Sequence, residues 1–216
     1  IKCDVTDASS ITDTCSFEVT RNDFPSAAIT GFDTALCDTT IYTIDAIDPI
    51  IGNGAWTSLG AASVANDSIN VTAVSGLSIG SNSFVWTVVN GVCDPNTDTI
   101  DIVVDERPTI ANLPSAQSLC DFDETEVTAN VPTVGTGVWS TSSSLDLSDT
   151  LSETLSITNI PLGNHKLYWT ISNGTCPPSV DSTMIYNNVI PVVDAGDNVS
   201  RFAGKDVTFN PIVTDA

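Results

Sequence analysis

Positive charge is scarce in this 216-residue chain, which has 6 lysines and arginines against 27 aspartates and glutamates. The formal net charge of −21 argues against nucleic acid as a partner, because nucleic-acid binding depends on Lys and Arg. It also argues against contact with anionic membranes, which attract basic segments. The acidic residues are dispersed along the chain, so we expect them to provide solubility and self-repulsion.

Long apolar runs are absent as well. No stretch of about 18 apolar residues occurs, so no membrane-spanning helix is predicted. The first residues lack the basic and apolar segments of a signal peptide. We therefore expect the chain to be a fragment of a longer protein, with export and anchoring signals elsewhere.

The residues of common catalytic sites are also missing. His165 is the single histidine, and its position in the repeat described below is occupied by Asn82 in the other copy. No Ser-His-Asp arrangement, phosphate-binding glycine loop or acid–base carboxylate pair is evident. We predict no enzyme activity and no cofactor, and we interpret His165 as an exposed strand residue.

The main positive feature is a repeat of 83 residues. Pro25, Pro108 and Pro191 have this spacing, and at least ten further residues have a twin 83 positions on. The first copies are Cys37, Gly52, Gly54, Trp56, Gly80, Trp86, Asn90, Gly91, Cys93 and Asp98. Constant spacing with loose sequence similarity is typical of an array of like domains.

The prolines suggest the domain boundaries. We predict two complete repeats, 25–107 and 108–190, between a C-terminal hairpin of another domain at 1–24 and the start of a further domain at 191–216. Proline fixes φ and removes a backbone donor, so these junctions are expected to be stiff. The predicted array is therefore elongated and semi-rigid.

Short runs rich in Val, Ile, Thr and aromatic residues, separated by turn residues, predict six or seven strands in each repeat. In the first repeat the predicted strands are 27–32, 39–46, 54–59, 68–75, 83–89 and 97–104, with a short edge strand at 62–65. In the second they are 109–113, 126–131, 138–142, 151–158, 165–172 and 180–186. Asn90-Gly91 and Asn173-Gly174 are predicted as type I′ hairpin turns. The predicted fold class is all-β, with tandem immunoglobulin-like β-sandwich domains.

Six cysteines without a CxxC pattern indicate an oxidising compartment. Within each repeat we predict one disulfide, Cys37–Cys93 and Cys120–Cys176. Each bond would be worth about 4 kcal/mol in the loop-entropy model.

All four tryptophans belong to the repeated set, and we predict that Trp56, Trp86, Trp139 and Trp169 lie in the cores. For Trp56 and Trp139, which follow glycine-rich turns, stacking on a sugar is an alternative. Two acidic clusters suggest calcium, because hard oxygen ligands in loops suit this ion. They are Asp121, Asp123, Glu124 and Glu126, and Asp94, Asn96 and Asp98. The competing interpretation is solvated acidic loops, and no metal site is assigned.

Three segments resemble known families. Residues 1–20, with Cys3 and Cys15, resemble the closing hairpin of the hyalin repeat. Residues 193–209 resemble the opening of a polycystic-kidney-disease (PKD) domain. The complete repeats, with Cys, Gly-x-Gly-x-Trp, Gly, Trp, Asn-Gly-x-Cys and Asp, resemble the repeats of giant Bacteroidota surface adhesins, including gliding-motility adhesins exported by type IX secretion.

These resemblances imply two kinds of covalent modification. In the hyalin family the two cysteines pair with cysteines earlier in the module, and a Cys3–Cys15 bond across the hairpin is the alternative here. Bacteroidota O-glycosylate Ser or Thr in Asp-Ser/Thr followed by an apolar residue, which makes Thr34, Ser68, Thr99 and Thr150 candidate O-glycosylation sites, and Ser182 fits more loosely.

We predict an extracellular, cell-surface role in cell adhesion. The chain would be a structural stalk segment that projects a distal binding region and bears tension. The alternatives are repeats that bind polysaccharide and spacers of a large secreted hydrolase. The expected partners are neighbouring repeats of the same chain, surface polysaccharide or other filament subunits, with no nucleic acid and no membrane contact.

Overall fold

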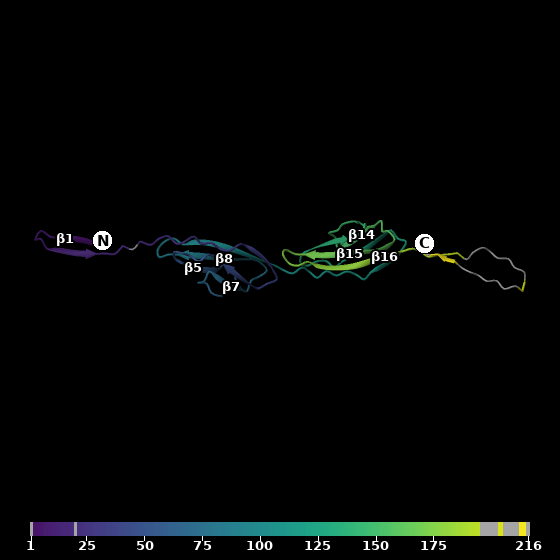
Figure 1. Ribbon diagram of the computed structural model, residues 1–216, viewed down its shortest axis with the longest axis horizontal. Helices are drawn as coiled ribbons and strands as arrows, with labels where there is room; N and C mark the ends of the chain where they lie inside the picture. Colours follow the sequence, from purple (N-terminus) through teal and green to yellow (C-terminus); the bar gives the residue numbers. More distant parts are fainter. Residues whose placement is uncertain (1, 20, 195–202, 205–211, 215–216) are drawn as a thin grey trace. The chain divides into compact units, whose positions relative to one another are not determined.

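The computed structural model describes residues 2–19, 21–194, 203–204 and 212–214. In these residues all regular secondary structure is β-strand. The chain divides into two compact units, Ile1–Val104 and Asp105–Ala216. Figure 1 labels β1 (Lys2–Thr6), β5 (Asn53–Ser58), β7 (Val71–Ser75) and β8 (Gly80–Val89) in the first unit, and β14 (Thr154–Thr158), β15 (Gly163–Ser172) and β16 (Ser179–Asn188) in the second.

The first unit contains a hairpin and a two-sheet sandwich. The hairpin pairs β1 with β2, and the sandwich has a four-stranded sheet of order β3-β9-β8-β5 and a three-stranded sheet of order β4-β7-β6. The strands are β1 Lys2–Thr6, β2 Thr12–Ser16, β3 Thr34–Cys37, β4 Ile41–Asp45, β5 Asn53–Ser58, β6 Ser63–Val64, β7 Val71–Ser75, β8 Gly80–Val89 and β9 Asn96–Asp105.

The second unit repeats this sandwich, with sheets of order β10-β16-β15-β12 and β11-β14-β13, and ends in a β17-β18 pair. Its strands are β10 Gln117–Cys120, β11 Glu124–Thr128, β12 Thr136–Thr141, β13 Asp146–Leu147, β14 Thr154–Thr158, β15 Gly163–Ser172, β16 Ser179–Asn188, β17 Val192–Asp194 and β18 Ile212–Thr214. Each of the seven strands β10 to β16 begins and ends 83 residues after its counterpart in β3 to β9. The 83-residue period of the sequence is therefore also the period of the backbone.

Alternation along the central strands builds each core, because successive side chains of a strand face opposite sides of the sheet. On β8, Phe84, Trp86 and Val88 are buried between the sheets, and β9 contributes Ile100, Ile102 and Val104. In the second repeat the corresponding strands bury Leu167, Trp169, Ile171 and Ile185. The predicted all-β, immunoglobulin-like sandwich is confirmed by this arrangement.

Two predicted strands are wrong. Residues 27–32 form only an isolated bridge between Thr30 and Ala46, and 109–113 form no strand. The strands that were missed, β3 and β10, follow a few residues later. The short strand β13, at Asp146–Leu147, was also not predicted.

The segment before β3 is held by hydrogen bonds to side chains of β9, instead of by backbone hydrogen bonds to a neighbouring strand. The Ala28 N–H donates to Asn96 Oδ1 at 2.7 Å, and the Thr30 N–H donates to Asp98 Oδ2 at 2.8 Å. The second repeat has the same arrangement, since the Ala111 N–H donates to Ser179 Oγ at 2.9 Å and the Leu113 N–H to Asp181 Oδ2 at 2.7 Å. Asp98 and Asp181, which the two repeats share, therefore fix the first segment of each sandwich to its last strand, a contact called the pin below.

The hairpin turns after β8 and β15 are not type I′, which requires positive φ at both central residues. Gly91 and Gly174 have φ of 60° and 50°, whereas Asn90 and Asn173 are not among the positive-φ residues. The Cys93 N–H donates to the Asn90 carbonyl at 3.2 Å, so glycine is the first central residue of the turn, as in type II′.

Candidate functional site

The tryptophans of each repeat form a pair in the core. Trp56 on β5 lies opposite Trp86 on β8, with ring centroids 5.1 Å apart. Trp139 on β12 and Trp169 on β15 repeat this arrangement at 5.0 Å. All four side chains are at most 3% exposed, so the predicted core positions agree with the structure.

Burial removes the sugar-stacking alternative for Trp56 and Trp139, because neither ring presents a face to solvent. Their indole N–H groups are also used internally. Trp56 Nε1 donates to the Asn70 carbonyl at 3.3 Å, and Trp139 Nε1 donates to the Ser152 carbonyl at 2.9 Å. The glycines that precede Trp56 and Trp139 predicted an exposed turn, whereas Gly54 and Gly137 make room for core side chains.

The second glycine of each Gly-x-Gly-x-Trp motif allows the ring of a tryptophan on the neighbouring strand to lie close to the backbone. A Cβ on Gly54 would overlap the six-membered ring of Trp86, and a Cβ on Gly137 would overlap that of Trp169. The first glycine has a different reason, since Gly52 and Gly135 have φ of 97° and 90°. The motif is therefore a packing device.

The predicted disulfides within the repeats are not formed. Cys93 and Cys120 are free thiols, whereas Cys37 and Cys176 are disulfide-bonded. The bonds Cys37–Cys93 and Cys120–Cys176 are thus both wrong for this structure.

Strand register gives the physical reason. Cys120 is the last residue of β10 and lies beside Asn188, the last residue of β16, in a parallel pair. Cys176 precedes the first residue of β16, Ser179, so the two sulfurs lie at opposite ends of a strand of roughly 30 Å. A disulfide requires Cα atoms within about 7 Å. The first repeat has the same strand bounds, which separates Cys37 from Cys93 in the same way.

The N-terminal hairpin brings its two cysteines together without joining them. Cys3 and Cys15 are directly opposite in the β1-β2 register, and Cys15 Sγ lies 3.5 Å from the Cys3 carbonyl oxygen. Both are free thiols, so the Cys3–Cys15 bond is not formed. The sequence argument that they could face each other is correct.

His165 is buried rather than exposed, with 7% of its surface accessible. Its Nε2 lies 2.7 Å from the Pro161 carbonyl, while Nδ1 has no partner among the described residues. Its counterpart Asn82 bonds the equivalent loop, donating to the carbonyls of Ser78 and Gly80. In the second repeat Asn187 adds an amide that donates to the Ile160 carbonyl at 3.0 Å. His165 therefore helps to stabilise the loop that precedes β15.

The acidic clusters do not form a metal site in the described part of the chain, where no group of three or more His, Cys, Asp or Glu residues is placed to hold an ion. Two members of these clusters have a structural role instead, since the Asn96 and Asp98 side chains accept hydrogen bonds from the backbone of the segment before β3. The backbone and side-chain hydrogen bonds from Thr30 lower the pKa of Asp98.

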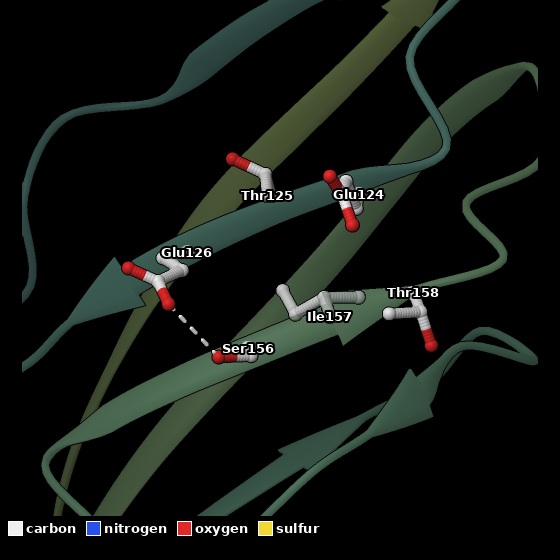
Figure 2. A pocket seen from close by; sticks show the side chains of 6 residues that line it. All are labelled: Glu124, Thr125, Glu126, Ser156, Ile157 and Thr158. Carbon is white, nitrogen blue, oxygen red and sulfur yellow. Dashed lines mark hydrogen bonds between the residues drawn. The ribbon is translucent and has the colours of Figure 1, made fainter.

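A shallow groove of about 330 Å³ lies over β11 and β14 of the second repeat, as Figure 2 shows. It is lined by Glu124, Thr125, Glu126, Ser156, Ile157 and Thr158. Ser156 Oγ donates to Glu126 Oε1 at 3.1 Å across the two strands. No aromatic side chain lines the groove, and its one large apolar side chain, Ile157, is buried, so it offers little to a small-molecule ligand.

The candidate O-glycosylation sites differ in exposure. Ser68, Thr99 and Ser182 are exposed, whereas Thr34 and Thr150 are half-buried. Ser68 Oγ is already engaged with Asp67 Oδ1 at 2.9 Å. An exposed hydroxyl is the minimum that a glycan needs, and three of the five sites meet it.

The PKD-like segment falls mostly outside the described residues, which include only 191–194, 203–204 and 212–214 of it. There β17 pairs antiparallel with β18. Among the described residues, no helix has the length and apolar character needed to cross a bilayer.

No known protein family matches the sequence, and neither does any curated protein. Solved structures do resemble it. Extracellular domains 3–5 of Drosophila OTK align at 10% identity and a TM-score of 0.55, covering 87% of this chain and 70% of that one. Immunoglobulin domains 1–4 of Sidekick-1 align at 10% identity and a TM-score of 0.52, covering 86% of this chain and 57% of that one. Murine CEACAM1b aligns at 14% identity and a TM-score of 0.51, covering 76% of this chain and 100% of that one. At these identities the similarity shows the fold, and the chain is an all-β protein of tandem immunoglobulin-like domains.

Several residues have structural roles that the sequence did not predict. Asp98 and Asp181 were visible as repeated residues, but their function as pins depends on the segment that they contact. Asn82 and Asn187 carried no signal, because each occurs in one repeat only.

Proposed function

We propose that this chain is a structural stalk segment of a long secreted cell-surface adhesin or filament. It would project a distal binding region and bear tension between its ends. Tandem immunoglobulin-like domains are consistent with a structural or adhesion repeat segment. The observation that supports a load-bearing role most directly is the pairing of the first and last strands of the repeat.

β10 and β16 run parallel, with Gln117 beside Ile185 and Cys120 beside Asn188. A pull on the chain would draw β10 from its first residue and β16 from its last residue, in opposite directions along the strands. All hydrogen bonds of this pair would then carry the load together, in shear. The first repeat has the same strand order, with β3 beside β9.

The residues shared by the repeats support the same proposal. The tryptophans lie in the cores, and Gly54 and Gly137 leave the space that the Trp86 and Trp169 rings occupy beside the backbone. The aspartates pin the segments before β3 and β10. The shared tryptophans, glycines and aspartates described above all serve the fold, which fits a spacer better than a series of binding sites.

The proposal places the chain outside the cell, as a Bacteroidota adhesin repeat exported by type IX secretion and used in gliding motility. O-glycans at Ser68, Thr99 and Ser182 would attach at exposed positions. There they would shield strand edges from proteases and from pairing with other chains.

Electron microscopy of intact source cells tests the stalk role. A gold-labelled antibody raised against residues 25–190 should mark thin filaments that extend tens of nanometres from the cell. Label confined to the cell margin or to the medium would contradict the proposal and would favour a spacer in a secreted hydrolase. Strong binding of the same residues on a glycan array would favour the polysaccharide-binding alternative.

A further inference from the structure

The outer face of the four-stranded sheet in the second repeat carries no acidic side chain. In β10, β12, β15 and β16 the odd-numbered residues face the core, so the even-numbered residues face outward. None of these even-numbered residues is Asp or Glu, and none is buried. In a chain with 27 acidic residues, a whole sheet face without a carboxylate is a distinct surface, called the outer face below.

The larger side chains of the outer face lie together at its middle. Lys166 lies opposite Met184, and Tyr186 lies opposite Asn164 on the same two strands. On the other side of Lys166, its Nζ lies 5.0 Å from the centroid of the Tyr168 ring, in a cation–π contact. This group contains the single methionine of the chain and two of its three tyrosines. Tyrosine and methionine are enriched at protein–protein interfaces.

The equivalent face of the first repeat has a different chemistry. The residues that replace Lys166, Tyr168, Met184 and Tyr186 there are Ser83, Val85, Asp101 and Val103. Asp101 places a carboxylate in the middle of that face, where it accepts a hydrogen bond from Ser83 Oγ. The first repeat builds the same sandwich with these residues, so the aromatic and acid-free character of the outer face is not required by the fold.

We propose that a second copy of this chain covers the outer face, so that the second repeats of two chains pack sheet against sheet. Each chain has a formal charge of −21, and approach through a surface without carboxylates meets the least repulsion. Lys166 is the single cation between residues 108 and 190, and Tyr168 already partners its ammonium group. The contact is isologous, because both copies use the same face. This inference goes beyond the stalk role and would stand if that role failed.

The size of the outer face favours a weak and reversible contact. At about 3.4 Å per residue and about 4.8 Å between strands, the four strands cover roughly 500 Å². Two copies would bury about 1,000 Å², which is the low end for a specific interface. We therefore expect monomer and dimer to exchange. High salt should favour the dimer, because it screens the repulsion between two acidic chains.

Sedimentation equilibrium of the whole 216-residue chain tests the proposal over a wide range of protein and salt concentration. The protein is made in a host that adds no O-glycans, since a glycan on Ser182, opposite Tyr168, would cover the outer face. It is kept reduced, so that its free thiols form no cross-links. We expect a reversible dimer whose dissociation constant falls as salt rises. A chain that stays monomeric under all conditions would overturn the proposal.

Two substitutions to the residues of the first repeat locate the contact. Met184→Asp adds a carboxylate to the outer face, and Tyr186→Val removes an aromatic ring. Each should weaken the dimer by about tenfold or more, because an isologous contact contains each change twice. Ser144→Asp adds the same charge in an exposed loop and should change the dissociation constant by less than about twofold.

The variants also separate a second copy from other occupants. Circular dichroism should show both variants folded, because the first repeat folds with Asp101 and Val103 at these positions. Wild-type affinity in both Met184→Asp and Tyr186→Val would overturn the proposal. A monomeric wild type whose binding on a glycan array is lost in the same variants would also overturn it, and would assign the outer face to a polysaccharide.

Discussion

Trp56 and Trp86 lie directly opposite each other on neighbouring strands, with ring planes inclined at 48°, and the backbone of Gly54 lies against the Trp86 ring. The same three-part arrangement recurs in the second repeat with Trp139, Trp169 and Gly137. The contact joins β5 to β8 in the buried core, and it depends on the absence of a side chain at Gly54.

Gly54→Ala should destabilise the first repeat by about 1–3 kcal/mol, since the added methyl group would force the Trp86 ring out of its position. Gly60→Ala is the matched control, because a Cβ there would meet no atom within 4 Å. Urea denaturation followed by tryptophan fluorescence measures both. Equal stability of the two variants would contradict the packing role of the motif.

Asn82→Ala should cost about 1–3 kcal/mol, because the carbonyls of Ser78, Gly80 and Ile102 would lose the amide donor of a buried side chain. Ser81→Ala, at the exposed neighbouring position, should change stability by less than about 0.5 kcal/mol. Chemical denaturation gives the difference. A loss in Asn82→Ala no larger than that of the control would show that the loop does not depend on this side chain.

Asp98 should make stability depend on pH. Its folded pKa is lowered chiefly by the Thr30 N–H, so its contribution is present above the ordinary aspartate value of about 3.9 and is lost as pH falls through the folded pKa. The free energy of unfolding of the first repeat should therefore fall below about pH 4. Asp98→Asn should flatten this dependence.

The control for this prediction is Asp94→Asn, which changes an exposed aspartate in the loop before β9. Denaturant titrations at several pH values between about 2 and 6 compare the slopes of the three proteins. An Asp98→Asn variant with the wild-type slope would show that the pin does not depend on the charge.

Cys93→Ala should change the melting temperature of the oxidised protein very little, because Cys93 is a free thiol in a surface turn. A Cys37–Cys93 bond would instead make the variant less stable by about 4 kcal/mol. Thermal denaturation by circular dichroism distinguishes the two cases. A large fall in melting temperature would restore the disulfide within the repeat.

Some of the fold follows from local pattern. The alternation of Phe84, Trp86 and Val88 predicted β8 and its buried face, and the constant spacing of repeated residues predicted two like sandwiches. These features depend on the two-residue period of a strand and on the repetition of the domain, and a single sequence shows both.

Other features depend on tertiary geometry that the sequence does not encode locally. Ala27–Phe32 has the composition of a strand, but the side chains of Asn96 and Asp98 occupy its donors. The spacing of Cys120 and Cys176 suited a disulfide, whereas their positions at opposite ends of β16 rule it out. His165 looked exposed because its partner, the Pro161 carbonyl, lies in a loop without a sequence signal.

If the chain bears tension, the strand pairs β3-β9 and β10-β16 should carry the load in shear. Single-molecule force spectroscopy, with the chain pulled from its ends under reducing conditions, tests it with Ser118→Pro and Leu119→Pro. Successive N–H groups of a strand point to opposite sides, so one of the two variants removes an N–H that faces β16. Ser144→Pro, in the exposed loop between β12 and β13, is the control.

The 83 residues of a repeat have an extended length of roughly 29 nm, and unfolding should lengthen the chain by that value less the span of the folded repeat. One of the two β10 variants should unfold its repeat at a clearly lower force than the control, while the first repeat keeps its wild-type force. Unfolding forces that are the same in wild type, both β10 variants and the control would contradict a load-bearing role for this strand pair.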